Sequence, residues 1–352
     1  MRSHIGKVIT ICRWCATWPG HRQSHLDRPN AEKDGARCVI QRTWSTKTLS
    51  DFGVFQAKDP SIIHVGDNPK MGEVLNYFFW LCYVAARKNF ISNERRMSFM
   101  QSLSLLNIAP TLAEFFGISL TSRVHPVEQI LKVMHARNPQ VVVLLVIDSL
   151  DIQFYSDFAD ELEVLHELVK RDDSLLLECE TVSNHTTPAI ASILTGLRPE
   201  SHKIRTSEDV GKSKINSILE IIDDAGTPTA VVLETNGTKP LLGRISYVFP
   251  VDDREDIVEY DALIKTHTIS VLNHQHEVRF VFSHLRAIDR FAHRGLDLRV
   301  AAKVTNENMR AIANAVGERN GMLFICGDHK AHLKEREESQ GKATVPLIVS
   351  CP

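Results

Sequence analysis

The chain lacks the features that would assign it to several broad classes of protein. Its 352 residues carry a formal net charge of −2, so no excess of one sign indicates nucleic acid or another strongly charged partner. No long apolar stretch occurs near residue 1, and a secretory signal is not expected. The apolar segment at residues 75–86 is too short to span a bilayer. With 43% hydrophobic residues, the composition is that of a soluble globular protein.

Cysteine is sparse and follows no pattern typical of a disulfide framework. The seven cysteines are an odd number, and Cys12 and Cys15 form a single Cys-x-x-Cys pair without a second pair of ligands at suitable spacing. This motif is weak support for zinc or redox chemistry. Reduced cysteines and a cytoplasmic location are therefore expected.

The first part of the chain differs in character from the rest. Residues 1–95 contain all four tryptophans, and the first fifty residues carry nine Lys or Arg against three Asp or Glu. A basic excess of this kind can contact nucleic acid or anionic lipid, but without interleaved aromatic residues it is more typical of a solvated tail. We expect residues 1–95 to be a poorly ordered or atypical extension and residues 96–352 to form one domain.

Apolar strand patterns alternate with amphipathic helix patterns along that domain. The run at residues 141–147 is apolar throughout, as in a strand buried on both faces. Other strand and helix patterns alternate with it: strands at 229–233, 245–249, 278–283 and 322–326, and helices at 162–168, 215–225 and 300–316. This alternation predicts an α/β fold, a three-layer α/β/α sandwich with a largely parallel central sheet.

Polar residues with metal-binding groups follow three of these strands. Asp148 follows the strand at 141–147, Asp289 and His293 stand four residues apart after the strand at 278–283, and Asp328 and His329 follow the strand at 322–326. Each alone has an ordinary interpretation as a turn, cap or surface residue. Because ligand sites in parallel sheets form at the carboxyl ends of the strands, the set together indicates a metal site. A mixed carboxylate and imidazole set suits Zn²⁺, with Mn²⁺ or Fe as alternatives.

Thr186 stands where a short helix is predicted to begin. Pro188 suits a first helical turn, and Gly196 suits a helix end. A threonine at this place is commonly only an N-cap. However, the unpaired amides of a first turn also favour negative charge beside the hydroxyl, as attack on a phosphate requires.

At these positions the chain resembles the alkaline phosphatase superfamily, and most closely its type I phosphodiesterase and nucleotide pyrophosphatase branch. The resemblance covers about residues 100 to 352. It rests on the strand ending in Asp148, a Thr-x-Pro motif at residues 186–188, Thr-Gly-Leu-Arg-Pro-Glu-Ser-His at residues 195–202, the Asp289 and His293 pair, and the Asp-His at 328–329. The nucleophile motifs of sulfatase-like and phosphoglycerate mutase-like members fit less well.

The resemblance implies a role for each of these residues. Thr186 would be the nucleophile. The metal ion that activates its hydroxyl would be bound by Thr186 together with Asp148, Asp328 and His329. Asp289 and His293 would hold a second ion. The family adds a third imidazole to that second site, shortly before the strand predicted at residues 345–349, but residues 339–344 contain no histidine.

Two further positions bear on how closely the chain follows the family pattern. His332 is the nearest substitute for the missing imidazole, although a solvated histidine in the charged segment 330–338 is an equally good interpretation. Ser207 stands about where the branch has an asparagine that helps to hold a phosphate oxygen. The second metal ion and the orientation of the substrate are therefore the points at which this chain can differ from its family.

The order of the elements also differs from the family. Residues 107–116 read as a helix capped by Asn107 and ended by Gly117. This helix resembles one that the superfamily places after the strand equivalent to residues 345–349. A circular permutation accounts for this order, and it predicts that the helix packs beside that strand; a chance amphipathic helix is the alternative.

These observations predict a phosphodiesterase or nucleotide pyrophosphatase with two divalent metal ions, a phosphothreonine intermediate and a small-molecule phosphate ester as substrate. The alternative is a degenerate, non-catalytic module that binds a phosphorylated ligand or partner. No nucleic acid and no membrane span are expected. The sequence leaves the oligomeric state undetermined.

Overall fold

The computed structural model describes residues 103–331 and 343–352, together with two short strands, β1 (Cys38–Val39) and β2 (Ile62–Ile63). The chain divides into two units, Met1–Met100 and Gln101–Pro352. Apart from β1 and β2, which pair in antiparallel fashion, the predicted extension at residues 1–95 lies outside the described residues. Its predicted character therefore stays a prediction.

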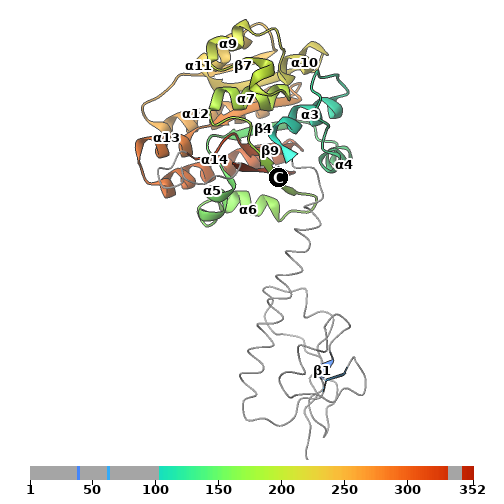
Figure 1. Ribbon diagram of the computed structural model, residues 1–352, viewed down its shortest axis with the longest axis vertical. Coiled ribbons are helices and arrows are strands. Elements are labelled where there is room, and N and C mark those ends of the chain that lie inside the picture. The colour runs from blue at the N-terminus through green and yellow to red at the C-terminus, as the bar shows by residue number, and fades with distance from the viewer. Residues whose placement is uncertain (1–37, 40–61, 64–102, 332–342) are drawn as a thin grey trace, which may run out of the picture. The chain divides into compact units, whose positions relative to one another are not determined.

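The second unit is built on an eight-stranded sheet (Figure 1). Its strands, in spatial order, are β3 (Leu103–Ser104), β5 (Leu175–Glu180), β10 (Thr344–Ser350), β9 (Met322–Gly327), β4 (Val142–Ile147), β8 (Phe280–Leu285), β6 (Thr229–Glu234) and β7 (Tyr247–Val251). Only β10 runs antiparallel to its neighbours. The carboxyl ends of all the other strands therefore point to one edge of the sheet.

Two apolar layers cover the two faces of the sheet. In β4, Val143 and Leu145 face one layer and Leu144 and Val146 face the other, because side chains alternate along a strand. The first layer is completed by α5 (Ile152–Asp157), α6 (Glu163–Val169), α12 (Ile257–His274), α13 (Ala287–Arg294) and α14 (Leu298–Glu318). The second is completed by α3 (Ile108–Phe116), α4 (Glu128–Arg137), α7 (Thr186–Thr195) and α10 (Ile218–Asp224). The predicted three-layer α/β/α sandwich with a largely parallel sheet is confirmed.

Helix α3 lies on the same face of the sheet as the apolar side chains of β10. Leu112 of α3 belongs to the layer that also contains Val345 and Leu347. This placement is compatible with the proposed permutation but does not distinguish it from an independent helix, so circular permutation stays a prediction. Gly117 ends α3 in a left-handed conformation, while the Asn107 side chain accepts from the amide of Ser104 and does not cap α3.

Short helical segments connect these elements. These are α8 (Pro199–His202), α9 (Ser207–Lys212), α11 (Thr235–Thr238) and the 3-10 helix η3 (Lys239–Leu241), with another 3-10 turn, η2 (Leu105–Asn107), before α3. Within the part of the chain that the structure describes, no helix has both the length and the apolar character needed to cross a membrane.

Candidate metal and nucleophile site

Asp148, Asp328 and His329 come together at the carboxyl edge of the sheet. Strands β4 and β9 are parallel neighbours, with Ile147 paired to Gly327, so the residues that follow them emerge side by side. All three side chains are buried, with at most 1% of each residue exposed. Their position at the ends of adjacent parallel strands is typical of ligand sites in α/β proteins.

Backbone packing fixes the turn that follows β4. The carbonyl oxygen of Leu150 lies where a Cβ on Gly327 would stand, so only glycine permits β9 and this turn to approach so closely. Ser149, in the middle of the turn, has a φ of 65°, a left-handed conformation that is unusual for a residue other than glycine. Its amide donates to Oδ1 of Asp328 at 3.1 Å, which ties the turn to the neighbouring strand.

The imidazole of His329 is the centre of the cluster. Its Nε2 lies 3.2 Å from Oδ1 of Asp148 and 3.4 Å from Oδ2 of Asp328. The same nitrogen lies 3.2 Å from Oγ1 of Thr186, while Nδ1 lies 3.0 Å from the carbonyl oxygen of Lys330. The Lys330 carbonyl accepts a proton held on Nδ1, so Nε2 is the ring nitrogen directed at the cluster.

Thr186 is the first residue of α7 and is half-buried. Its Oγ1 also lies 3.5 Å from Oδ1 of Asp148. The helix ends as predicted, with Gly196 in the left-handed conformation. The free amides of the first turn and the helix dipole both place positive potential beside the hydroxyl, so this is a suitable place for phosphate oxygens.

Asp289 and His293 lie on one side of α13, one turn apart. Oδ1 of Asp289 lies 3.4 Å from Nε2 of His293, whose side chain is 56% exposed. Ligand atoms of Asp289, Asp148 and His329 lie within 4.8 Å of one another, which joins the two predicted ligand sets. His293 therefore marks the solvent side of the cluster, and Asp289 the buried side.

A buried carboxylate anchors the start of α13. Asp261 of α12 accepts hydrogen bonds from the backbone amides of Arg286 and Ala287, at 2.8 and 3.0 Å. These amides have no partner within the helix, so the carboxylate both satisfies them and fixes the direction of the turn that carries Asp289. Burial raises the pKa of Asp261 to about 7, although the two amide hydrogen bonds act in the opposite direction.

His284 also belongs to the cluster, although the motifs did not identify it. Its Nε2 lies 3.6 Å from Oδ2 of Asp148, and ligand atoms of His284, Asp148 and Asp328 lie within 4.8 Å of one another. Strand β8 runs two residues further than the sequence predicted, to Leu285, so His284 faces the same side as Phe280 and Phe282. The sequence could have identified His284 if the predicted strand had been extended past residue 283, because side chains alternate along a strand and His284 then shares a face with Phe280 and Phe282.

Two other predicted positions remain to be placed. His332 lies outside the described residues, so the predicted third imidazole of the second site stays a prediction. Ser207 is the first residue of α9.

The pKa values of the cluster residues are shifted because the side chains are buried close to one another. Burial, together with the charge of Asp328, raises the pKa of Asp148 to about 8. Burial alone would lower the pKa of His329, but its hydrogen bond to Asp148 and the charges of both carboxylates raise it to about 10. Burial and the positive charge of Arg286 keep the pKa of His284 well below its usual value.

The donor set fits a divalent cation. Among the described residues, Oδ2 of Asp328 and Nε2 of His284 are buried atoms without a hydrogen-bond partner, and both belong to the possible metal-binding group. Leaving such atoms unsatisfied costs about 1–3 kcal/mol each, and a cation bound between them would remove this cost. Carboxylate oxygens and imidazole nitrogens in this combination are ligands of zinc and similar divalent metals.

A comparison with protein families finds a match for the part of the chain that carries Asp148 and Thr186. Residues 142–214 match the family described as type I phosphodiesterase / nucleotide pyrophosphatase. The matched segment includes Asp148, Thr186 and the 195–202 motif, so the resemblance predicted from these motifs is confirmed. No curated protein matches the sequence.

Several solved structures are similar at low identity. Phosphonoacetate hydrolase from Sinorhizobium meliloti 1021, in complex with phosphonoacetate, is 16% identical with a TM-score of 0.42, over 55% of this chain and 57% of that one. The C-terminal periplasmic domain of EcEptC from Escherichia coli is 14% identical with a TM-score of 0.41, over 60% and 72%. The chain thus spans little more than half the length of the first of these, and neither similarity decides its function.

Proposed function

We propose that this chain is a metal-dependent phosphodiesterase or nucleotide pyrophosphatase in which Thr186 is the nucleophile. One observation carries the proposal: Oγ1 of Thr186 lies 3.2 Å from Nε2 of His329 and 3.5 Å from Oδ1 of Asp148, at the first turn of a helix. A hydroxyl beside two metal-type ligands and a positive helix end is arranged for attack on phosphorus.

We assign the ligands of two divalent ions from these positions. Asp148, Asp328, His329 and Thr186 would hold the first ion, and Asp289 and His293 the second. His284 is within reach of the first set, while His332 remains the candidate given by the sequence for the second. Zn²⁺ suits this donor set best, with Mn²⁺ or Fe as alternatives. When bound, the ions supply positive charge that lowers the pKa of the hydroxyl and offsets the charge of the phosphate.

The chain's own residues then perform the reaction in two steps. The Thr186 oxygen forms a bond to phosphorus as the bond to the leaving ester oxygen breaks, and that oxygen takes up the proton that the hydroxyl gave up. The amides of the first turn of α7 receive the non-bridging phosphate oxygens. Water then attacks the phosphothreonine and releases the second product, which restores the threonine.

A non-catalytic module that binds a phosphorylated ligand is the second candidate. The observation that favours it is the lack of a histidine at residues 339–344, where the family has its third imidazole. Such a module would bind its ligand through the same helix amides and cations without turnover.

Elemental analysis of the purified protein, followed by an assay with bis-p-nitrophenyl phosphate, separates the two candidates. The enzyme proposal expects bound divalent metal and a metal-dependent release of p-nitrophenol. Thr186→Ala should reduce this activity by about a thousandfold or more while leaving the fold intact. Activity that survives unchanged in Thr186→Ala would defeat the nucleophile assignment, and a folded protein that binds inorganic phosphate without turnover would favour the module.

A further inference from the structure

A cavity of about 290 Å³ lies beside Thr186, on the face of the sheet that α7 covers. Its walls come from α7, α9 and α10, from strands β6 and β8, and from η3 with the residues that follow it. Thr186 and His284 are both part of the wall, so the cavity borders the nucleophile and the cluster of metal-type ligands.

Ten of the 21 residues that line the cavity are aliphatic, and Thr187, Thr195 and Ser217 add hydroxyl groups to its wall. The side chains that contribute most clearly to the aliphatic character are Ile190, Leu194, Leu219, Val231, Leu233 and Leu241. Their surface lacks the hydrogen-bonding groups that would recognise a sugar or a nucleobase. A group buried against them gains about 0.8 kcal/mol for each methylene removed from water.

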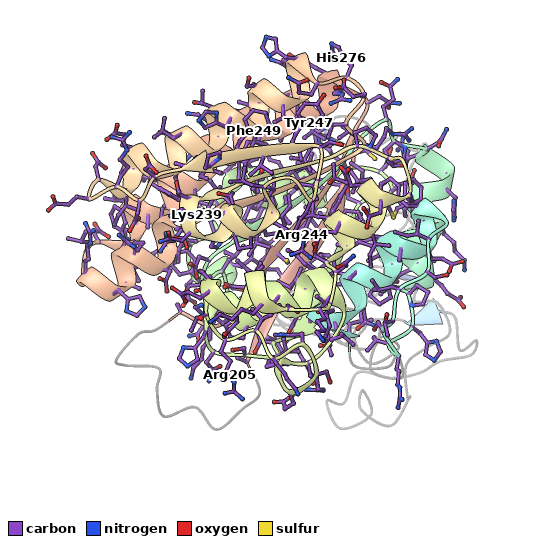
Figure 2. The ribbon with its side chains drawn as sticks, turned by 90° about the horizontal axis from the view of Figure 1, so that it is seen from above. Arg205, Lys239, Arg244, Tyr247, Phe249 and His276 are labelled. Carbon is purple, nitrogen blue, oxygen red and sulfur yellow. The ribbon has the colours of Figure 1, made fainter. Side chains whose placement is uncertain are left out.

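The charged residues of the wall are paired with each other. Arg286 contacts Glu234 with an N–O distance of 2.7 Å, and Arg244 forms an ion pair with Glu220. Arg244 lies on the segment between η3 and β7, where Figure 2 labels it. Since each of these arginines already has a carboxylate partner, neither needs a ligand of opposite charge, and the cavity favours an uncharged occupant.

The position of the cavity relative to Thr186 restricts which part of a substrate enters it. Attack in line places the leaving oxygen on the side of phosphorus opposite the threonine oxygen. The ester group that stays on phosphorus projects sideways from this line, next to Thr186, which lines the cavity. The cavity can therefore receive this ester group, and the leaving group departs away from it.

We propose that this cavity binds an alkyl chain, and that the substrates of this protein are phosphodiesters in which the retained ester group is alkyl. The inference rests on the proposed function, since it takes Thr186 as the nucleophile. The first step joins the Thr186 oxygen to an alkyl-bearing phosphorus and releases the other alcohol. Hydrolysis of this intermediate releases an alkyl phosphate monoester.

A series of p-nitrophenyl alkyl phosphates tests the inference, because the leaving group is constant while the alkyl chain grows from methyl to decyl. We expect kcat/KM to rise about fourfold for each added methylene and then to level off when the cavity is full. A value of kcat/KM that is the same for every chain length would overturn the inference while leaving the proposed function intact.

Two substitutions in the wall should move the preferred chain length in opposite directions. Ala191→Leu fills part of the cavity and should shorten it, while Leu241→Ala enlarges the cavity and should lengthen it. Leu168→Ala removes an equally buried leucine on the other face of the sheet and should leave the preference unchanged. An unchanged preference in both folded wall variants would contradict the inference.

Binding provides a second measurement that needs no turnover. The affinity for n-alkylphosphonates, measured by calorimetry on the purified protein, should increase with chain length and should lose this dependence in folded Ala191→Leu. If no diester is hydrolysed but the chain-length dependence of binding is found, the proposed function fails while the alkyl site stands. If binding shows no chain-length dependence either, the alkyl site fails as well.

Discussion

The hydroxyl of Ser149 donates a hydrogen bond to Oδ1 of Asp289, with 2.9 Å between the two oxygens. The same hydroxyl lies 3.4 Å from Nδ1 of His329, and the Ser149 amide donates to Asp328. One residue thus contacts two candidate ligands that follow β9 and one that lies on α13. It does so in a left-handed conformation that costs a residue other than glycine about 1–2 kcal/mol.

Removal of this hydroxyl should weaken the site without unfolding the protein. We expect Ser149→Ala to lower kcat/KM or metal affinity by about 10- to 100-fold, as is typical when a group that orients a metal ligand is lost. Ser149→Gly should be as inactive as the alanine variant but more stable than it by about 1 kcal/mol, because glycine adopts this φ without strain. Steady-state assays and urea unfolding check both statements. Full activity in the glycine variant would exclude a role for the hydroxyl.

His284 should contribute to metal binding. Its buried Nε2 lies 3.6 Å from Asp148 and has no hydrogen-bond partner among the described residues, so a bound cation is the group that would satisfy it. We expect His284→Ala to lower the affinity for Zn²⁺ by about 10- to 100-fold in competition with a chelator. His202→Ala is the matched control, because His202 is equally buried but bonds to Ser192 away from the cluster. Equal affinity in the two variants would assign His284 a packing role.

Metal affinity should increase with pH. A metal ion must displace the protons of its ligands, and the pKa values of Asp148 and His329 are raised to about 8 and about 10 in the metal-free protein. At neutral pH this coupled pair holds at least one proton that the metal ion must displace, so affinity should rise by about tenfold or more per pH unit from pH 6.5 to 7.5. Chelator competition at several pH values measures this, with Asp148→Asn as the variant in which the slope should decrease. A flat profile in the wild-type protein would be incompatible with this account.

Asp261 should make folding stability depend on pH. Its pKa is raised to about 7 in the folded protein, from the model-compound value of 3.8 that applies to the unfolded chain. Between these values the folded state holds a proton that the unfolded state has lost, so this group's contribution to stability falls as pH rises from about 4 to 7. The carboxamide of Asp261→Asn cannot titrate. The stability advantage of the wild type over this variant, measured by urea unfolding of the metal-free proteins, should therefore shrink across that range and stay level above it.

Asp261→Asn should also lower stability at every pH. The two carboxylate oxygens accept one amide each, from Arg286 and Ala287, whereas asparagine offers only one oxygen. Leaving one buried amide without an acceptor costs about 1–3 kcal/mol. A variant with wild-type stability at pH 8 would show that these hydrogen bonds do not hold α13 in place.

The sequence was sufficient for the features that depend on local patterns. The apolar run that became β4 identified a central strand, and Gly196 marked the end of α7 as observed. Asp148, Asp328 and His329 could be placed near each other because the ends of parallel strands share one edge of a sheet. The family motifs then supplied the connection to Thr186, which strand patterns alone do not give.

Features that depend on packing between distant segments could not be predicted in this way. The position of His284 required the exact end of β8, and strand ends are the least reliable part of a sequence-based assignment. The link between Ser149 and Asp289 joins residues 140 positions apart through a left-handed turn, and no local pattern announces it. The anchoring of α13 by Asp261 depends on how α12 packs against it, which periodicity does not determine. The cytoplasmic location expected from the cysteines stays a prediction.

The central claim is that the Thr186 oxygen attacks phosphorus, and trapping the covalent intermediate tests it most directly. Metal-loaded protein is mixed with bis-p-nitrophenyl phosphate, quenched in acid within one turnover, digested and examined by mass spectrometry. The account predicts a p-nitrophenyl phosphate adduct on Thr186, formed together with one equivalent of p-nitrophenol and absent from Thr186→Ala. Rapid turnover with no adduct at Thr186, or with an adduct on another residue, would contradict it.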